Sequence, residues 1–253
     1  MKSVLTHKLS LFLLGFLAIL LLVVLINFLI IKYNGRPVPA PSTPRAAEVY
    51  GKGTPLIYVI LGDSTTVAQG GEYDKGYARV TARYLADQGH EVTFFNVGVS
   101  GARAKDVADK QTPQAAAVRP DVVLIAVGAN DVTHLTNPSD VRTSLSKSID
   151  ALRTANKDVK IILTGSPDMG TVPRFPQPTR FLMGQRTRQI NAMVVDLAKE
   201  KNVIFAPIAE KTGPIFAAHH ELYAQDNFHP NRGGYDTWTP VLTTALTQAI
   251  TKQ

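Results

Sequence analysis

Five short apolar segments recur along the chain after residue 55, and they constrain the fold more than any other feature. They comprise residues 56–61, 91–96, 121–127, 160–164 and 203–206. Helical patterns separate most of them, at residues 75–88, 138–156 and 181–201, and Pro240 favours a closing helix that begins between residues 234 and 240. Apolar, β-branched runs of this length are typical of buried strands. Strands that alternate with helices predict an α/β three-layer sandwich with a five-stranded, mainly parallel sheet.

A long apolar segment precedes this pattern, from residue 11 to residue 31, and only Gly15 and Asn27 interrupt it. At 1.5 Å per helical residue, its length matches a hydrocarbon core about 30 Å thick. The alternative is a cleaved signal peptide, whose apolar region is usually only about 7–15 residues long. The nearest small-residue cleavage site, at residues 38–40, is followed by a proline. We therefore expect residues 1–32 to form an uncleaved, single-pass transmembrane anchor.

Residues 33–54 are expected to link this anchor to a single domain that spans residues 55–253. The segment is rich in proline (Pro37, Pro39, Pro41 and Pro44). Closely spaced prolines favour extended backbone, which predicts a spacer that holds the domain off the bilayer without a fixed orientation. Lysines lie on both sides of the apolar segment, so their distribution gives no orientation. An extracytoplasmic domain is the usual arrangement for such an anchor, and we adopt it as the expectation.

Composition excludes several classes of function. The chain has no cysteine, which rules out a disulfide scaffold, a thiolate metal site and a cysteine nucleophile. The net charge is +7, but no run of Lys and Arg is interleaved with aromatic residues, so we expect no nucleic-acid partner. The pair His219-His220 lacks a third ligand at metal-site spacing, and no glycine-rich phosphate loop occurs. We therefore expect neither a metal nor a cofactor.

Four short polar motifs stand out in the 55–253 region, and three of them directly follow a predicted strand. They are Gly62-Asp63-Ser64-Thr65, Asn96-Val97-Gly98-Val99-Ser100-Gly101, Gly128-Ala129-Asn130-Asp131 and Asp226-Asn227-Phe228-His229-Pro230. In this order they resemble the four sequence blocks of the SGNH/GDSL hydrolases, and the likeness runs from residue 56 to the last helix. Thr65 departs from the leucine often found at that position, which carries no chemistry. The resemblance implies a flavodoxin-like SGNH hydrolase fold and a serine esterase.

The residues themselves also suit acyl transfer, which needs a hydroxyl, a neighbouring base and a group that orients the base. Ser64 lies where a strand gives way to a loop, so we expect its side chain to be exposed. Of the six histidines, only His229 has an acid three residues before it and a proline after it. Ser64, His229 and Asp226 are therefore the predicted catalytic triad. The alternatives are a turn serine and a surface histidine.

An acyl-transfer site also needs donors directed at the negative charge that develops on the substrate oxygen. The resemblance implies that these are the backbone N–H groups of Ser64 and Gly98 and the side-chain amide of Asn130. An ordinary turn glycine and a turn asparagine are the alternatives. Asp63 and Asp131, which adjoin these residues, are interpreted as structural groups that bind N–H groups of the loops.

Two further features are expected near the substrate. His134 follows Asn130 closely and either lines the substrate mouth or is a surface loop histidine. Residues 165–180 are irregular and rich in proline, and they follow a predicted strand on the active-site side. We expect this segment to shape substrate access.

The favoured function is hydrolysis of a carboxylic ester, such as an acetyl or short acyl group on a glycan, a lipid or a small molecule. The alternative is an O-acyltransferase of envelope glycans that uses the same triad. A catalytically silent binding domain is a third hypothesis, and it predicts the loss of a site residue. Ser64, Asn130, Asp226 and His229 are all present, which disfavours it.

Overall fold

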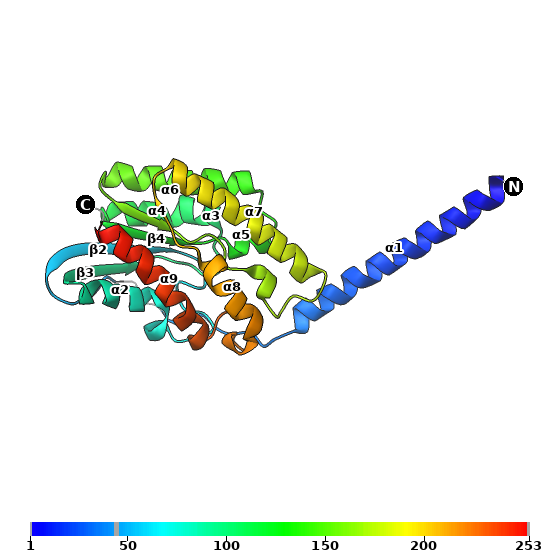
Figure 1. Ribbon diagram of the computed structural model, residues 1–253, viewed down its shortest axis with the longest axis horizontal. Helices are drawn as coiled ribbons and strands as arrows, with labels where there is room; N and C mark the ends of the chain where they lie inside the picture. Colours follow the sequence, from blue (N-terminus) through cyan, green and yellow to red (C-terminus); the bar gives the residue numbers. More distant parts are fainter. Residues whose placement is uncertain (1, 43–45, 252–253) are drawn as a thin grey trace.

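A computed structural model describes residues 2–42 and 46–251 of the chain. Helix α1 (Lys2–Tyr33) projects away from an α/β domain that holds the rest of the described residues (Figure 1). Its Leu11–Tyr33 segment has a mean hydropathy of 3.1, and its apolar side chains are almost all exposed. This length and composition suit either a signal sequence or a single-pass anchor. Pro44 of the expected spacer lies outside the described residues.

Within the described residues, the sheet has six strands instead of the expected five, in the order β1-β3-β2-β4-β5-β6. Five strands are parallel, and β1 pairs antiparallel with β3 at one edge. The strands are β1 (Glu48–Tyr50), β2 (Thr54–Gly62), β3 (His90–Asn96), β4 (Val122–Ala126), β5 (Lys160–Leu163) and β6 (Ile204–Phe205). The extra strand lies in the segment expected to be a linker. With only three residues it shows no periodicity, and pairing with β3 is what orders it.

Helices cover both faces of the sheet, which gives the predicted three layers (Figure 1). One face carries α2 (Tyr77–Asp87), α8 (Ile208–Ala218) and α9 (Arg232–Thr251). The other carries α3 (Ala104–Asp106), α4 (Thr112–Ala117), α5 (Ala129–Thr133), α6 (Pro138–Ala155) and α7 (Thr179–Glu200). Because both faces are covered, all five residues of β4 are buried.

The closing helix begins earlier than predicted, at Arg232, and Pro240 lies inside it. The side chain of Asn231 accepts a hydrogen bond from the N–H of Gly234 at 3.2 Å, as a helix cap does. Tyr235 and Trp238 in the first turns are buried. Capping and aromatic packing therefore set this start, and the proline is accommodated further along.

The carboxyl ends of the central strands bring the predicted motifs together. In the sheet register, Ile60 of β2 pairs with Asn96 of β3, and Gly62 pairs with Ala126 of β4. A Cβ on Gly62 would lie 2.0 Å from the carbonyl oxygen of Ala126, so only glycine fits at this strand end. The loops after β2, β3 and β4 thus leave one edge of the sheet side by side, as parallel topology predicts.

The segment after α1 is not the free spacer that its prolines predicted, because it packs on the domain. The N–H of Arg36 donates to the carbonyl of Gln225 at 2.8 Å, and the side chain of Gln69 donates to the carbonyl of Val38 at 2.9 Å. A Cβ on Gly35 would lie 2.3 Å from the backbone oxygen of Asp226. Backbone hydrogen bonds and close contact therefore hold this segment against the Asp226 loop.

Candidate active site

Ser64 lies two residues beyond the end of β2, in a turn that Asp63 organises. One carboxylate oxygen of Asp63 accepts hydrogen bonds from the Thr65 N–H at 3.0 Å and from the Thr65 hydroxyl at 2.9 Å. Only 6% of the Ser64 surface is exposed, whereas the sequence predicted an exposed side chain. His229 lies against Ser64, and both line one end of a pocket, so Ser64 is not at an open strand end.

Asp226 and His229 share one tight turn before α9. Asn227 in this turn adopts a φ of 55°, and the Ala224 N–H donates to the carbonyl of His229 at 2.8 Å. The turn directs both side chains toward Ser64. The Nδ1 atom of His229 lies 2.6 Å from Oδ2 of Asp226, and its Nε2 atom lies 2.9 Å from Oγ of Ser64. The three residues singled out in the sequence thus form one continuous hydrogen-bonded chain.

The environment of Asp226 favours its ionised form. Burial alone would raise its pKa, but hydrogen bonds from the His229 ring, the His229 N–H and the Phe228 N–H lower the pKa overall. Both backbone N–H groups donate to Oδ1 at 3.0 Å, which leaves Oδ2 for the ring. An ionised Asp226 accepts a hydrogen bond from Nδ1–H of His229, so Nε2 is free to accept the Ser64 hydroxyl proton.

The three predicted oxyanion donors differ in how they are engaged. The N–H of Ser64 has no acceptor among the described residues. The amide of Asn130 donates one hydrogen to the carbonyl of Ala102 at 3.0 Å, and its second hydrogen remains for a ligand. The N–H of Gly98, in contrast, donates to the side chain of Asn96 at 3.0 Å.

Gly98 also has less space around it than an ordinary turn glycine. A Cβ there would lie 1.8 Å from the hydroxyl oxygen of Thr66, so no larger residue fits. The Asn96 side chain bridges this loop to the turn of Ser64 by donating to the carbonyl of Thr66 at 2.8 Å. In the sequence Asn96 is marked only as the first residue of its motif. The structure identifies it as the residue that positions Gly98 relative to Ser64.

Asp63 and Asp131 hold loops, as interpreted from the sequence. Asp131 accepts a hydrogen bond from the N–H of Ala104 at 2.9 Å, which ties the loop after β4 to the loop after β3. Burial raises the pKa of both carboxyls, although the hydrogen bonds from Thr65 and from the Ala104 N–H act in the opposite direction. Neither aspartate takes part in the chain of Ser64, His229 and Asp226.

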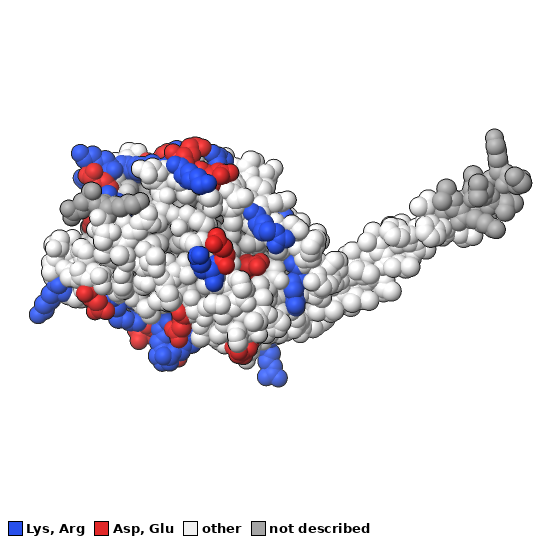
Figure 2. Space-filling model, viewed as in Figure 1, with Lys and Arg blue, Asp and Glu red and all other residues white. Residues whose placement is uncertain are grey.

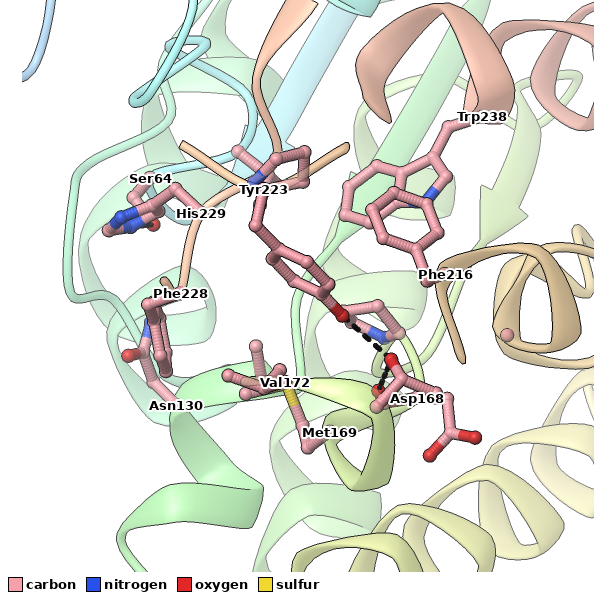
Figure 3. Close-up of a pocket in the computed structure, with 16 residues that line it drawn as sticks. Ser64, Asn130, Asp168, Met169, Val172, Phe216, Tyr223, Phe228, His229 and Trp238 are labelled. Atoms are coloured by element: carbon pink, nitrogen blue, oxygen red, sulfur yellow. Dashed lines mark hydrogen bonds between the residues drawn. The ribbon is translucent and has the colours of Figure 1, made fainter. Parts of the chain in front are cut away.

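A largely apolar pocket opens beside Ser64 and His229 (Figure 3). Ser64, His229 and Asn130 lie at one end in this view, Phe216 and Trp238 lie at the other, and Tyr223 stands between them. The remaining labelled walls include Met169, Val172 and Phe228. Hydroxyls supply some polarity: Thr171 and Tyr223 bind each other at 2.7 Å, and Thr171 donates to the carbonyl of Asp168 at 2.8 Å. The pocket suits an apolar acyl or alkyl group.

Sequence reasoning found the polar end of this pocket but missed most of its walls. Residues 165–180 contribute Pro167, Asp168, Met169, Thr171 and Val172, so the segment shapes the pocket as expected. Phe216 comes from α8 and Trp238 from α9, and no local pattern marks them as neighbours of Ser64. His134 is exposed and is not among the residues that line the pocket, which favours the surface interpretation.

Comparisons with known proteins bear on the fold and on the family. A GDSL-like esterase of Mycobacterium tuberculosis is 26% identical over 228 residues, which cover 84% of this chain and 72% of that protein. The solved structure of TesA superposes with a TM-score of 0.64 and 17% identity, and the match covers 76% of this chain and 99% of TesA. The esterase EstA of Pseudoalteromonas sp. gives a TM-score of 0.60 and 17% identity over 77% of this chain and 98% of EstA.

Because the sequence identities are low, these two structural similarities show the fold alone. The sequence itself bears on the family, because residues 60–237 match the GDSL-like Lipase/Acylhydrolase family. This match contains Ser64, Gly98, Asn130, Asp226 and His229. The chain therefore belongs to the GDSL-like lipase/acylhydrolase family, a family of carboxylic ester hydrolases.

Proposed function

We propose that this protein is a membrane-anchored serine hydrolase that cleaves carboxylic acyl esters through Ser64, His229 and Asp226. The observation that carries the proposal is the hydrogen-bonded chain of these three residues at one end of an apolar pocket. The match to a carboxylic ester hydrolase family supports it. The apolar helix α1 supports the anchor. We place the catalytic domain on the extracytoplasmic side because this is the usual arrangement for such an anchor.

The geometry suggests a two-step mechanism. Nε2 of His229 takes the proton of the Ser64 hydroxyl as Oγ bonds to the ester carbonyl carbon. The N–H of Ser64 and the amide of Asn130 stabilise the negative oxygen of the tetrahedral intermediate. His229 then returns the proton to the departing alcohol, which leaves an acyl group on Ser64. Water, deprotonated by His229, attacks this acyl group. The bond from Oγ of Ser64 to the carbonyl carbon then breaks, His229 returns the proton to Oγ, and the acid is released.

Asp226 stabilises the charged imidazolium that exists in the middle of each step. Its lowered pKa keeps it ionised, so it favours the protonated ring without taking the proton itself. Gly98 would be a third oxyanion donor if its N–H turned from Asn96 to the substrate. With the Gly98 N–H bound to Asn96, the N–H of Ser64 and the amide of Asn130 are the two proposed oxyanion donors.

Product analysis distinguishes hydrolysis from acyl transfer by the same triad. We expect the purified full-length protein to convert p-nitrophenyl acetate to acetate, with little acetylated polyol even when a polyol acceptor is present. Water reaches the acyl group without a binding site, whereas a sugar acceptor needs polar partners, and the described residues beside Ser64 form a largely apolar pocket. Chromatography of the products with and without the acceptor makes the comparison. Predominant formation of the acetylated polyol would replace this proposal with the acyltransferase.

A further inference from the structure

Asn27 is the one strongly polar side chain within the apolar stretch of α1, and the structure shows what it contacts. Only 9% of Asn27 is exposed, whereas its neighbours Ile26 and Phe28 are 45% and 58% exposed. Its amide donates to the carbonyl of Val23 at 3.0 Å, and its oxygen accepts from the hydroxyl of Thr179 at 3.0 Å. Thr179 is the first residue of α7. The polar interruption of the apolar helix is therefore the point at which the domain docks on it.

Further contacts follow toward the end of α1. The guanidinium of Arg174 donates to the carbonyl of Ile31 at 3.2 Å. The Asn34 amide donates to the carbonyl of Pro173 at 2.9 Å, and the oxygen of Asn34 accepts from the amide of Asn227 at 2.9 Å. The last two turns of the helix are thus bound to the domain. A membrane that holds α1 would also fix the orientation of the domain.

This docking places the first turn of α7 beside the apolar helix, at the level of Asn27 (Figure 1). Asn27 precedes the last residue of α1, Tyr33, by six positions, which is about 9 Å along the helix. Interfacial helices bury their apolar side chains to about this depth. The first turn of α7 exposes two large apolar side chains, Phe181 at 58% and Leu182 at 52%.

The charges around this level also suit a lipid surface. Figure 2 shows no charged side chain along the part of α1 that is drawn white, between the domain and the grey end. Basic residues lie at the domain end of the helix: Lys32, Arg36, Arg174 and Arg180. Among the described residues, none of these four forms an ion pair with a carboxylate. Basic side chains at the domain end of α1 that have no carboxylate partner suit phosphate head groups.

Two of the residues that line the pocket beside Ser64 adjoin these contacts in the chain. Val172 lines the pocket and is followed by Pro173, whose carbonyl binds Asn34. Phe228 lines the pocket and follows Asn227, whose amide binds Asn34. Phe228 packs edge-on against Phe175, with 6.0 Å between ring centroids. This part of the pocket wall is therefore one or two residues from the groups that hold α1.

We propose that Phe181 and Leu182 form a second membrane contact, which turns the pocket mouth toward the bilayer and selects acyl esters carried by membrane lipids. This inference rests on the proposed function, because it needs both the anchor and the ester-cleaving triad. It adds the substrate class and the path by which the substrate enters. A lipid enters the pocket acyl chain first, along the apolar rim, without crossing the aqueous phase.

The membrane contact can be measured directly because the chain contains no cysteine. Leu182→Cys gives a single thiol for an environment-sensitive fluorophore, and Val49→Cys, on the edge strand β1 and 64% exposed, gives a matched control. Both full-length proteins are placed in vesicles of phosphatidylcholine and phosphatidylglycerol that carry nitroxide-labelled lipids. We expect strong quenching of the label at 182 and little at 49. Equal quenching at the two positions would overturn the proposal.

The substrate class is tested with two esters on the same vesicles. One is p-nitrophenyl acetate in water, and the other is a long-chain 4-methylumbelliferyl ester dissolved in the bilayer. We expect the double variant Phe181→Ser with Leu182→Ser to hydrolyse the bilayer ester about tenfold more slowly, with unchanged turnover of the soluble ester. Asn27→Leu, which keeps the helix apolar but removes the bond to Thr179, should act in the same direction. Val49→Ser should leave both rates unchanged.

The outcomes separate this proposal from the one on which it rests. Unchanged hydrolysis of the bilayer ester by both the double variant and Asn27→Leu would overturn the membrane contact and leave the esterase intact. Wild-type protein that does not float with the vesicles, or a mature chain that begins near Pro41, would overturn the anchor. Wild-type protein that cleaves neither ester would overturn the proposed function itself.

Discussion

Replacing Ser64 with alanine is expected to lower kcat for p-nitrophenyl acetate by at least about a thousandfold, because alanine has no oxygen that can accept the acyl group. The expected cost in stability is small. The substitution removes one hydroxyl and its 2.9 Å hydrogen bond to His229, a change of about 1 kcal/mol in the free energy of unfolding. The measurement is kcat per folded molecule, together with the melting temperature.

Ser146→Ala is the matched control for this variant. Ser146 lies on the surface of α6, and its one side-chain hydrogen bond among the described residues is to Asp150 at 3.4 Å. We expect wild-type kcat for this control. Ser64→Ala with more than about a tenth of the wild-type rate would show that another residue is the nucleophile.

Replacing Asn130 with alanine is expected to lower kcat about 10²–10³-fold and to change KM little, because its amide binds the developing oxyanion more strongly than the ground-state carbonyl. Asn130→Asp should be at least as damaging, since it directs a negative charge at another. The hydrogen bond from Asn130 to Ala102, at 3.0 Å, makes some loss of stability part of the expectation. Melting temperature and kcat are therefore measured on the same sample.

Asn137→Ala is the control that distinguishes a catalytic role of Asn130 from a structural one. Asn137 caps α6 by accepting a hydrogen bond from the Ser139 N–H at 3.0 Å, and its loss should cost about 1 kcal/mol of stability without changing kcat. If Asn130→Ala behaved like this control, Asn130 would be a turn residue. The oxyanion hole would then be left to backbone N–H groups.

The five parallel strands and the polar end of the site could be predicted because each depends on local sequence. Buried parallel strands are short apolar runs, and the Gly62 and Asn130 motifs follow two of them directly. Asp226 and His229 lie three residues apart, so one turn suffices to bring them together. Parallel topology then carries these loops to one edge of the sheet.

Features that depend on contacts between distant segments could not be predicted. Strand β1 has three residues and exists only because β3 offers a free edge. The far wall of the pocket joins Phe216 and Trp238 from two helices with weak periodicity, each interrupted by a proline. The docked segment after α1 has the composition of an extended, proline-rich spacer. Its position on the domain is set by hydrogen bonds from Asn34 and Arg36.

The central claim is that Ser64 is the acyl-accepting nucleophile, and covalent trapping tests it most directly. An alkyl p-nitrophenyl phosphonate imitates the tetrahedral intermediate and leaves a stable adduct on the attacking oxygen. Full-length protein is treated with this reagent, digested and analysed by tandem mass spectrometry. The proposed mechanism predicts one adduct, on Ser64, whose formation stops p-nitrophenyl acetate hydrolysis and is abolished in His229→Ala. An adduct on another residue, or full inhibition without an adduct on Ser64, would contradict it.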